Sequence, residues 1–252
     1  MNYDFFTPTM RGSGRAIFLC LVCLFVLLPL LKGQSTDQQD LEKEVRKALG
    51  AKKRAALKNI SFKVTTQQGE MIQEAQVVIQ GKDRAAVMLT EQADSMVYVR
   101  NGESYFARTR HGILDLESIQ LQNQIDAYLT WVDLLGAIKW DGNTLEKEKL
   151  RQSGKTYLVV RQGKDELMKE LWIDSETKLP FRLKQFATYR GQQYPMTIEV
   201  TAYQKFHGVA LPVALVVLHE TAAGNYQTNQ QISNIRFDSR LSKKLFQAVK
   251  TQ

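Results

Sequence analysis

The stretch that decides the fold is residues 60–89, which read ISFKVTTQQGEMIQEAQVVIQGKDRAAVML. Ile60, Phe62 and Val64 are apolar and the residues between them are polar, so apolar side chains recur with a period of two. This period is typical of a strand with one buried face. The alternation recurs twice more before Leu89, and a glycine-containing turn separates each run from the next. The stretch therefore predicts three consecutive antiparallel strands.

Strand signals continue on both sides of one long interruption. Asn101-Gly102 stands between two short apolar runs, and this dipeptide is a strong hairpin signal because both residues tolerate positive φ. The further predicted strands lie at residues 97–99, 105–108, 144–152, 155–161, 166–174, 181–190, 194–206, 210–220 and 225–237. We predict a mainly β protein of about eleven antiparallel strands. A sheet of that size must curl, close or split to cover its apolar face.

Two segments have helical periodicity instead. Leu41, Val45 and Leu49 are four residues apart, which places them on one face of an N-terminal helix. Gly50 either ends this helix or lies within a longer one. Residues 116–140 carry a broad apolar stripe at helical spacing, so we predict one internal helix, or two short ones, that cover the sheet. Strands and helices do not alternate along the chain, so a parallel nucleotide-binding sheet is not expected.

The N-terminal segment has the pattern of a secretory signal peptide. Two arginines precede an unbroken apolar run over residues 16–31, which ends at Gly33 and gives way to polar sequence. The run is shorter than the ~20 residues that a transmembrane helix requires. We predict a signal peptide over residues 1–33, cleaved near Gly33, with an uncleaved anchor as the alternative. The exported part, residues 34–252, is predicted to be one periplasmic domain.

Both cysteines, Cys20 and Cys23, lie within this apolar run. No cysteine would remain after cleavage, so a disulfide, a thiol nucleophile and a cysteine metal site are not expected. Leu19 and Val22 precede the cysteines, whereas a bacterial lipoprotein requires a small residue at that position. A lipidated N-terminus is therefore not expected either.

The sequence offers little catalytic chemistry. Its three histidines, His111, His207 and His219, have no partner at metal-ligand spacing, and the chain has no G-x-S-x-G elbow and no phosphate-binding glycine loop. We predict no enzymatic activity, no catalytic residue, no metal and no cofactor. A hydrolase whose residues meet only in the fold is the least favoured alternative. The net charge is +8, but no basic strip is interleaved with aromatic residues, so nucleic-acid binding is not expected.

Short motifs in the second half follow one another in a fixed order. They are Leu171-Trp172-Ile173-Asp174, Lys178-Leu179-Pro180-Phe181-Arg182, Tyr203-Gln204-Lys205-Phe206-His207-Gly208-Val209-Ala210-Leu211-Pro212, Ile232-Ser233-Asn234-Ile235-Arg236-Phe237 and Leu245-Phe246. In this order and spacing the chain resembles the outer-membrane lipoprotein-sorting protein family, the LolA-like periplasmic carriers. Glycine and proline in these motifs have a direct steric use in turns and at strand starts, so we interpret the motifs as structural and not catalytic.

The resemblance implies a curved antiparallel half-barrel whose concave apolar side is covered by the N-terminal helix and by the internal helical segment, which acts as a lid. It implies a periplasmic carrier that binds lipoprotein acyl chains or another lipid and escorts them from an inner-membrane donor towards an outer-membrane acceptor. A lipid- or protein-sensing regulatory module on the same fold is the alternative. The candidate lipid contacts are alternating apolar positions, although burial in a core would also explain each of them. They are Phe62, Val64, Val77, Val87, Leu89, Val97, Val99, Leu129, Leu135, Ile138, Leu171 and Ile173.

Overall fold

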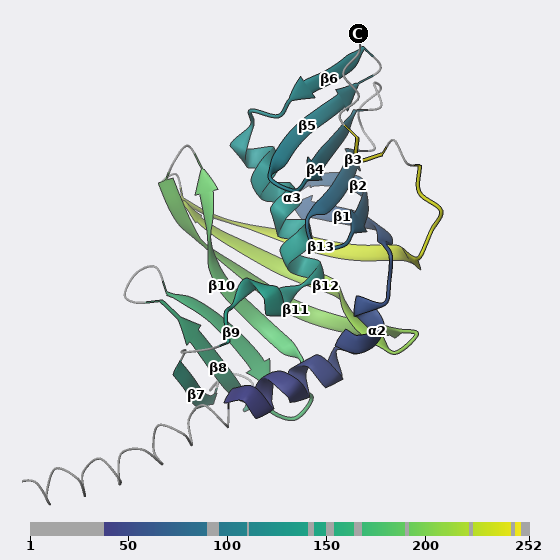
Figure 1. The fold of residues 1–252 in the computed structure, drawn as a ribbon. Coiled ribbons are helices and arrows are strands. Elements are labelled where there is room, and N and C mark those ends of the chain that lie inside the picture. Colours follow the sequence, from purple (N-terminus) through teal and green to yellow (C-terminus); the bar gives the residue numbers. More distant parts are fainter. Residues whose placement is uncertain are drawn as a thin grey trace, which may run out of the picture.

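The computed structural model of this chain describes residues 38–89, 96–109, 111–140, 144–149, 154–163, 168–189, 192–221, 224–242 and 245–247. The predicted signal peptide lies outside the described residues. Within them, thirteen strands form one sheet, and neighbouring strands pair antiparallel (Figure 1). The strands are β1 Ile60–Gln68, β2 Met71–Gln80, β3 Arg84–Leu89, β4 Val97–Asn101, β5 Ser104–Thr109, β6 Gly112–Asp115, β7 Thr144–Lys149, β8 Thr156–Gln162, β9 Lys169–Asp174, β10 Pro180–Tyr189, β11 Gln192–Phe206, β12 Val209–Thr221 and β13 Gly224–Phe237.

The predicted mainly β, antiparallel architecture is confirmed, with more strands than the expected number of about eleven. One strand absent from the prediction is β6, which has four residues. So short a strand cannot show a period of two clearly, and its identity comes from its pairing with β5.

The order of strands in the sheet differs from their order in the chain at one place only. The order is β6-β5-β4-β3-β2-β1-β13-β12-β11-β10-β9-β8-β7, so two meanders meet where β1 pairs with β13. Ile60 lies opposite Phe237 and Val64 opposite Ile232 in this central pair. The two edges, β6 and β7, follow one another in the chain and are joined by helical structure. The sheet stays open and curves around that helical connection (Figure 1).

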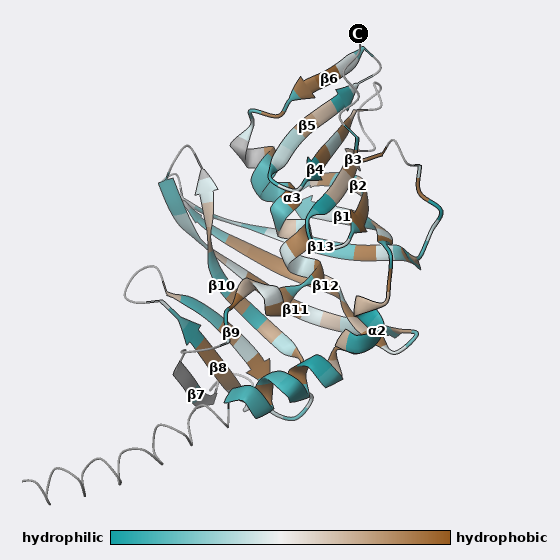
Figure 2. Cartoon of the chain, viewed as in Figure 1, coloured by the Kyte–Doolittle hydropathy of each residue, from teal (hydrophilic) through white to brown (hydrophobic). Residues whose placement is uncertain are grey.

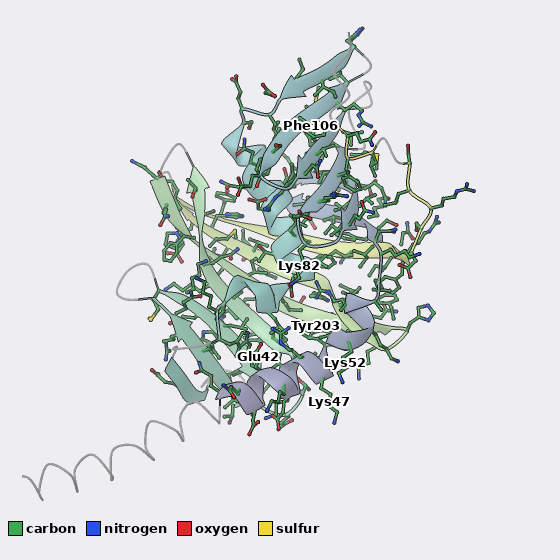
Figure 3. The ribbon with its side chains drawn as sticks, viewed as in Figure 1. Glu42, Lys47, Lys52, Lys82, Phe106 and Tyr203 are labelled. Carbon is green, nitrogen blue, oxygen red and sulfur yellow. The ribbon has the colours of Figure 1, made fainter. Side chains whose placement is uncertain are left out.

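Hydrophobic and hydrophilic residues alternate along several strands (Figure 2), and apolar side chains are buried on both faces of the sheet. The concave face carries the main core, a cluster of buried side chains that includes Phe62, Val77, Leu171, Leu183 and Leu211. The opposite face carries a second cluster near β2–β5. The second cluster consists of Val78, Ala86, Val99, Phe106 (labelled in Figure 3) and Phe246, with Leu241 and Leu245 packed against it. The C-terminal segment therefore covers part of the outer face of the sheet.

The N-terminal helix spans residues 38–48, and the short helix α2 follows over Ala51–Ala55. Gly50 separates them with a φ of 70°, and a Cβ atom at this position would lie 2.1 Å from the carbonyl oxygen of Gly208. The backbone N–H of Ala210 donates to the carbonyl of Leu49 at 3.1 Å. This close contact with the β11–β12 turn decides between the two alternatives for Gly50: the first helix ends there, and a separate helix begins.

The apolar side of the N-terminal helix packs as the sequence predicts. Leu41, Val45 and Leu49 are buried in the main core, so this helix covers the same face of the sheet as the internal helix. Lys47 and Lys52 point away from the sheet into solvent (Figure 3). The predicted half-barrel with two helical covers is therefore the observed arrangement.

Candidate functional site

The candidate site lies between the concave face of the sheet and the segment that joins its two edges. This segment, called the lid below, consists of α3, Ile119–Val132, and the 3-10 helix η1, Leu134–Ala137. The Ser118 side chain caps α3 by accepting a hydrogen bond from the backbone N–H of Leu121. Because the lid must lead from edge strand β6 to edge strand β7, the chain topology carries it across the concave face.

The lid is closed in this structure. Ile125, Tyr128 and Leu129 are buried in the main core, as are the lid residues nearer η1. The rings of Trp131 on α3 and Phe62 on β1 lie 4.7 Å apart between centroids. The apolar stripe that the sequence shows over residues 116–140 therefore packs against the sheet.

Three polar side chains tie α3 to one half of the sheet. Arg100 on β4 donates from Nη1 to Oδ1 of Asp126 on α3 at 2.7 Å, and the hydroxyl of Tyr105 on β5 donates to the same carboxylate at 2.8 Å. The Arg100 guanidinium also lies over the Tyr105 ring, 5.6 Å from its centroid. Burial, with the hydrogen bond to Asp126, raises the pKa of Tyr105 to about 12, so its hydroxyl remains a donor at neutral pH. These three residues are called the latch.

A few other polar groups lie where the lid packs on the sheet or just beyond its end. The Tyr128 hydroxyl accepts a hydrogen bond from Nε2 of Gln124 at 3.2 Å and also bonds Thr66 on β1. Burial raises the pKa of Tyr128. Trp131 and Thr228 each carry a buried polar atom with no hydrogen-bond partner among the described residues. The indole nitrogen of Trp140, three residues after η1, is also buried without a hydrogen-bond partner among the described residues.

Ten of the twelve candidate lipid contacts lie together in or against the main core. Nine are buried, namely Phe62, Val64, Val77, Val87, Leu129, Leu135, Ile138, Leu171 and Ile173, and Leu89 packs against them while half-buried. The structure thus brings side chains from β1, β2, β3, β9 and the lid to one surface. Whether they contact lipid stays a prediction.

The expected position of Val97 and Val99 on this surface is wrong. Val99 belongs to the second cluster on the outer face, and Val97 packs against that cluster. In the register of β3 and β4, Tyr98 lies opposite Val87, and Tyr98 is the β4 residue that faces the main core. The inward set of β4 is Tyr98 and Arg100, and the more apolar set, Val97 and Val99, packs on the outer face, so the alternation alone indicated the wrong face.

The latch residues were absent from the sequence prediction. Arg100, Tyr105 and Asp126 come from two strands and a helix, and each is an ordinary half-buried polar residue of its own element. The one signal in the sequence is that Asp126 is the only charged residue in the segment 119–132, which reads IQLQNQIDAYLTWV.

The sequence motifs of the second half have structural roles. Asp174 accepts hydrogen bonds at Oδ1 from the backbone N–H groups of Glu176 and Thr177, at 3.0 and 2.8 Å. Burial alone would raise the pKa of the Asp174 carboxyl, but these hydrogen bonds outweigh burial and hold its pKa below the usual range. The hydroxyl of Tyr203, labelled in Figure 3, donates to the carbonyl of Pro180 at 2.7 Å. The motifs therefore fix a turn and a strand start, as interpreted from the sequence.

The three histidines do not come together. His207 lies in the β11–β12 turn, His111 precedes β6, and His219 on β12 stacks on Tyr226, with 4.5 Å between ring centroids. Across the described ranges no group of three His, Cys, Asp or Glu side chains is arranged to bind a metal ion. In the same part of the chain no helix is both long and apolar enough to span a membrane.

A pocket of about 260 Å³ lies on the outer face. It is lined by Gln80, Arg84, Asn101, Leu241, Ser242, Phe246 and Gln247, beside the second cluster. The Asn101 side chain donates to the carbonyl of Phe246 at 3.1 Å, which ties the C-terminal segment to β4. This pocket is therefore separate from the predicted lipid contacts beneath the lid.

The chain matches no protein-family model and no curated protein sequence. Its structure is similar to that of a LolA superfamily protein from Nitrosomonas europaea, with a TM-score of 0.55 and 15% identity over 83% of this chain and 96% of the other. A DUF1329 family protein from Desulfovibrio piger gives a TM-score of 0.55 and 14% identity over 82% and 97% of the two chains. A domain from Vibrio parahaemolyticus, described as an outer membrane lipoprotein-sorting protein, gives 0.50 and 12% over 82% and 97%. The resemblance read from the sequence is thus confirmed at the level of the fold: this chain has the fold of the LolA superfamily.

Proposed function

We propose that this chain is a non-enzymatic carrier that is exported to the periplasm and binds lipoprotein acyl chains or another lipid between its lid and its sheet. Residues 34–252 would form the binding domain, and the cargo would pass from an inner-membrane donor towards an outer-membrane acceptor. The observation that supports this function best is the lid itself, an apolar helical segment that crosses an apolar concave face in an open sheet.

The energetics favour a surface of this kind for an acyl chain. Each CH₂ group removed from water contributes about 0.8 kcal/mol. The concave face is already covered in the closed structure, where Phe62, Val77 and Leu171 are fully buried. An acyl chain must therefore displace lid contacts and replace them with its own. Exchange of one apolar contact for another leaves a moderate net affinity, which allows a carrier to release its cargo.

The latch suits a lid that opens. It holds α3 to β4 and β5 through one carboxylate, and the Asp126 side chain is 42% exposed. Partly exposed ion pairs contribute little to stability. Most of the free energy that closes the lid therefore comes from apolar packing, which bound lipid can replace.

Two adjacent residues on β3 give a matched test. Leu89 packs against the main core and Met88 against the second cluster, and both are half-buried near the end of the strand. Leu89→Glu places a carboxylate on the concave face, and Met88→Glu places the same group on the outer face. Native mass spectrometry and lipid extraction of each purified protein measure bound lipid, and circular dichroism verifies that each variant folds.

The expected result is lipid bound to the wild type and to Met88→Glu, and at least tenfold less bound to Leu89→Glu. Wild-type protein that carries no lipid and does not bind added monopalmitoylglycerol or a triacylated peptide would exclude lipid binding. Transfer of bound lipid to phospholipid vesicles separates a carrier from a sensor. Lipid that stays bound in the presence of vesicles would favour the regulatory alternative.

A further inference from the structure

Two polar side chains are buried in the candidate site without a hydrogen-bond partner in the described part of the chain. They are Trp131, with a relative exposure of 3% and an unpaired indole Nε1–H, and Thr228, with a relative exposure of 8% and an unpaired hydroxyl. Folded proteins pair nearly all such groups, because a buried donor or acceptor without a partner loses its hydrogen bonds to water. Each of these two groups therefore needs an explanation.

Both side chains face the surface on which an acyl chain would lie. Trp131 extends from α3 to the Phe62 ring on the concave face of β1. Thr228 on β13 lies directly opposite Val217 on β12, and Val217 is part of the main core. Opposite residues in an antiparallel pair project to the same face of the sheet. The two unpaired groups thus come from the two sides of the candidate site, the lid and the sheet.

The indole N–H of Trp172, in another part of the sheet, does have a hydrogen-bond partner. Nε1 of Trp172 donates to Oε2 of Glu170 at 3.0 Å on the outer face of the sheet. Trp172 is buried as Trp131 is, but a carboxylate stands beside its indole, whereas Trp131 packs among the apolar side chains of the main core. The two tryptophans of the main core, Trp131 and Trp140, therefore have indoles that are unpaired among the described residues, whereas the indole of Trp172 on the outer face is paired.

We infer that Trp131 and Thr228 donate hydrogen bonds to carbonyl oxygens of the bound lipid, an inference that rests on the proposed function. The acyl chains of an ester- or amide-linked lipid supply apolar length and one strong acceptor at the carbonyl. A hydrocarbon offers no acceptor, and an ether-linked chain offers a much weaker one. The ligand class of this site is accordingly acyl esters and amides, and the two donors would fix the position of the acyl linkage beneath the lid.

Monopalmitoylglycerol and its ether analogue hexadecylglycerol form a matched ligand pair, because they share chain length and headgroup and differ at the carbonyl. Binding of each to wild type, Trp131→Phe and Thr228→Val is measured by fluorescence titration against a displaceable acyl probe. Trp131→Phe keeps an aromatic ring against Phe62 and removes the N–H. Thr228→Val keeps the shape and removes the hydroxyl. Trp172→Phe is the control, since it removes a paired indole from the outer face.

The wild type is expected to bind the ester about fivefold to tenfold more tightly than the ether, which is the size of effect expected for one hydrogen bond. Trp131→Phe and Thr228→Val should each reduce this preference, and Trp172→Phe should preserve it. Equal binding of ester and ether by all four proteins would overturn the inference and leave the lipid carrier intact. Failure of either ligand to bind the wild type would overturn the carrier and, with it, the inference. If one variant does not fold, the other decides the outcome.

Discussion

Removal of the latch should loosen the lid by an amount that the structure allows us to work out. Asp126→Ala eliminates the ion pair with Arg100 and the hydrogen bond from Tyr105. The ion pair contributes about 0.5 kcal/mol, because the carboxylate is partly exposed. The hydrogen bond contributes about 1 kcal/mol. Alanine is a better helix former than aspartate by about 0.5 kcal/mol, which offsets part of this loss.

The net loss of about 1 kcal/mol corresponds to an increase of about fivefold in the equilibrium constant for lid opening. Hydrogen exchange of the α3 backbone amides measures this equilibrium for openings in which α3 unfolds locally, because the hydrogen bonds within the helix must break before those amides exchange. The rate at which a bound fluorescent acyl probe exchanges should rise by a similar factor. The strands β8–β12 should keep their protection, since none of them contributes to the latch.

Glu199→Ala is the matched control. Arg182 donates from Nε to Glu199 at 2.8 Å. The side chains of this pair are about as exposed as those of Arg100 and Asp126 in the latch. This pair joins β10 and β11 through residues adjacent to the inward-facing Leu183 and Ile198, on the outer face. The reasoning is refuted if Asp126→Ala leaves α3 exchange at the wild-type rate, or if Glu199→Ala accelerates it equally.

Further predictions concern the junction of the helices and the titratable groups. Gly50→Ala should lower the free energy of unfolding by more than about 2 kcal/mol in urea titrations, because the new Cβ would collide with Gly208. The control is Gly69→Ala, at a position with positive φ and open space, which should lower it by about 1 kcal/mol. Similar losses in the two variants would exclude the collision. The pKa of Tyr105 is raised in the folded state, so the stability that Tyr105 contributes is present below pH 10 and is lost as the pH rises towards 12. The difference in unfolding free energy between wild type and Tyr105→Phe should therefore shrink over that interval. A constant difference would contradict the hydrogen bond from Tyr105 to Asp126. Burial lowers the pKa of His219, so the stability that the neutral, buried imidazole contributes is present above pH 6.5 and is lost as the pH falls below that value. Between pH 7.5 and 5 the unfolding free energy of His219→Gln should therefore fall less than that of the wild type. Equal falls in the two proteins would contradict the lowered pKa.

The strand pattern of this fold could be predicted where one face of a strand is plainly polar. In residues 60–89 the expected runs coincide closely with β1, β2 and β3. The inward face of β4 could not be identified from the sequence, because the C-terminal segment covers its outer face and Val99 is as buried as an inward residue. Only the register with β3 places Tyr98 inside.

The candidate site could be predicted in part for a related reason. Apolar positions on β1, β2, β3, β9 and the lid follow from periodicity, because each carries its own signal. The latch does not, since Arg100, Tyr105 and Asp126 meet only after α3 has packed on the sheet. The end of the first helix at Gly50 likewise depends on a contact with Gly208, which is distant in the sequence.

The pairing of β1 with β13 also controls when the fold can be completed. The first and the last strands in chain order, β1 and β13, pair within the sheet. The two meanders therefore cannot join into one concave face before β13 is available. Closing so large a loop costs conformational entropy before any of the central pairing compensates for it, and contacts of this kind slow folding. A chain that is threaded through a membrane pore from its N-terminus would keep this central pair unmade until β13 had crossed. The topology thus delays completion of the concave face until the last strand is available.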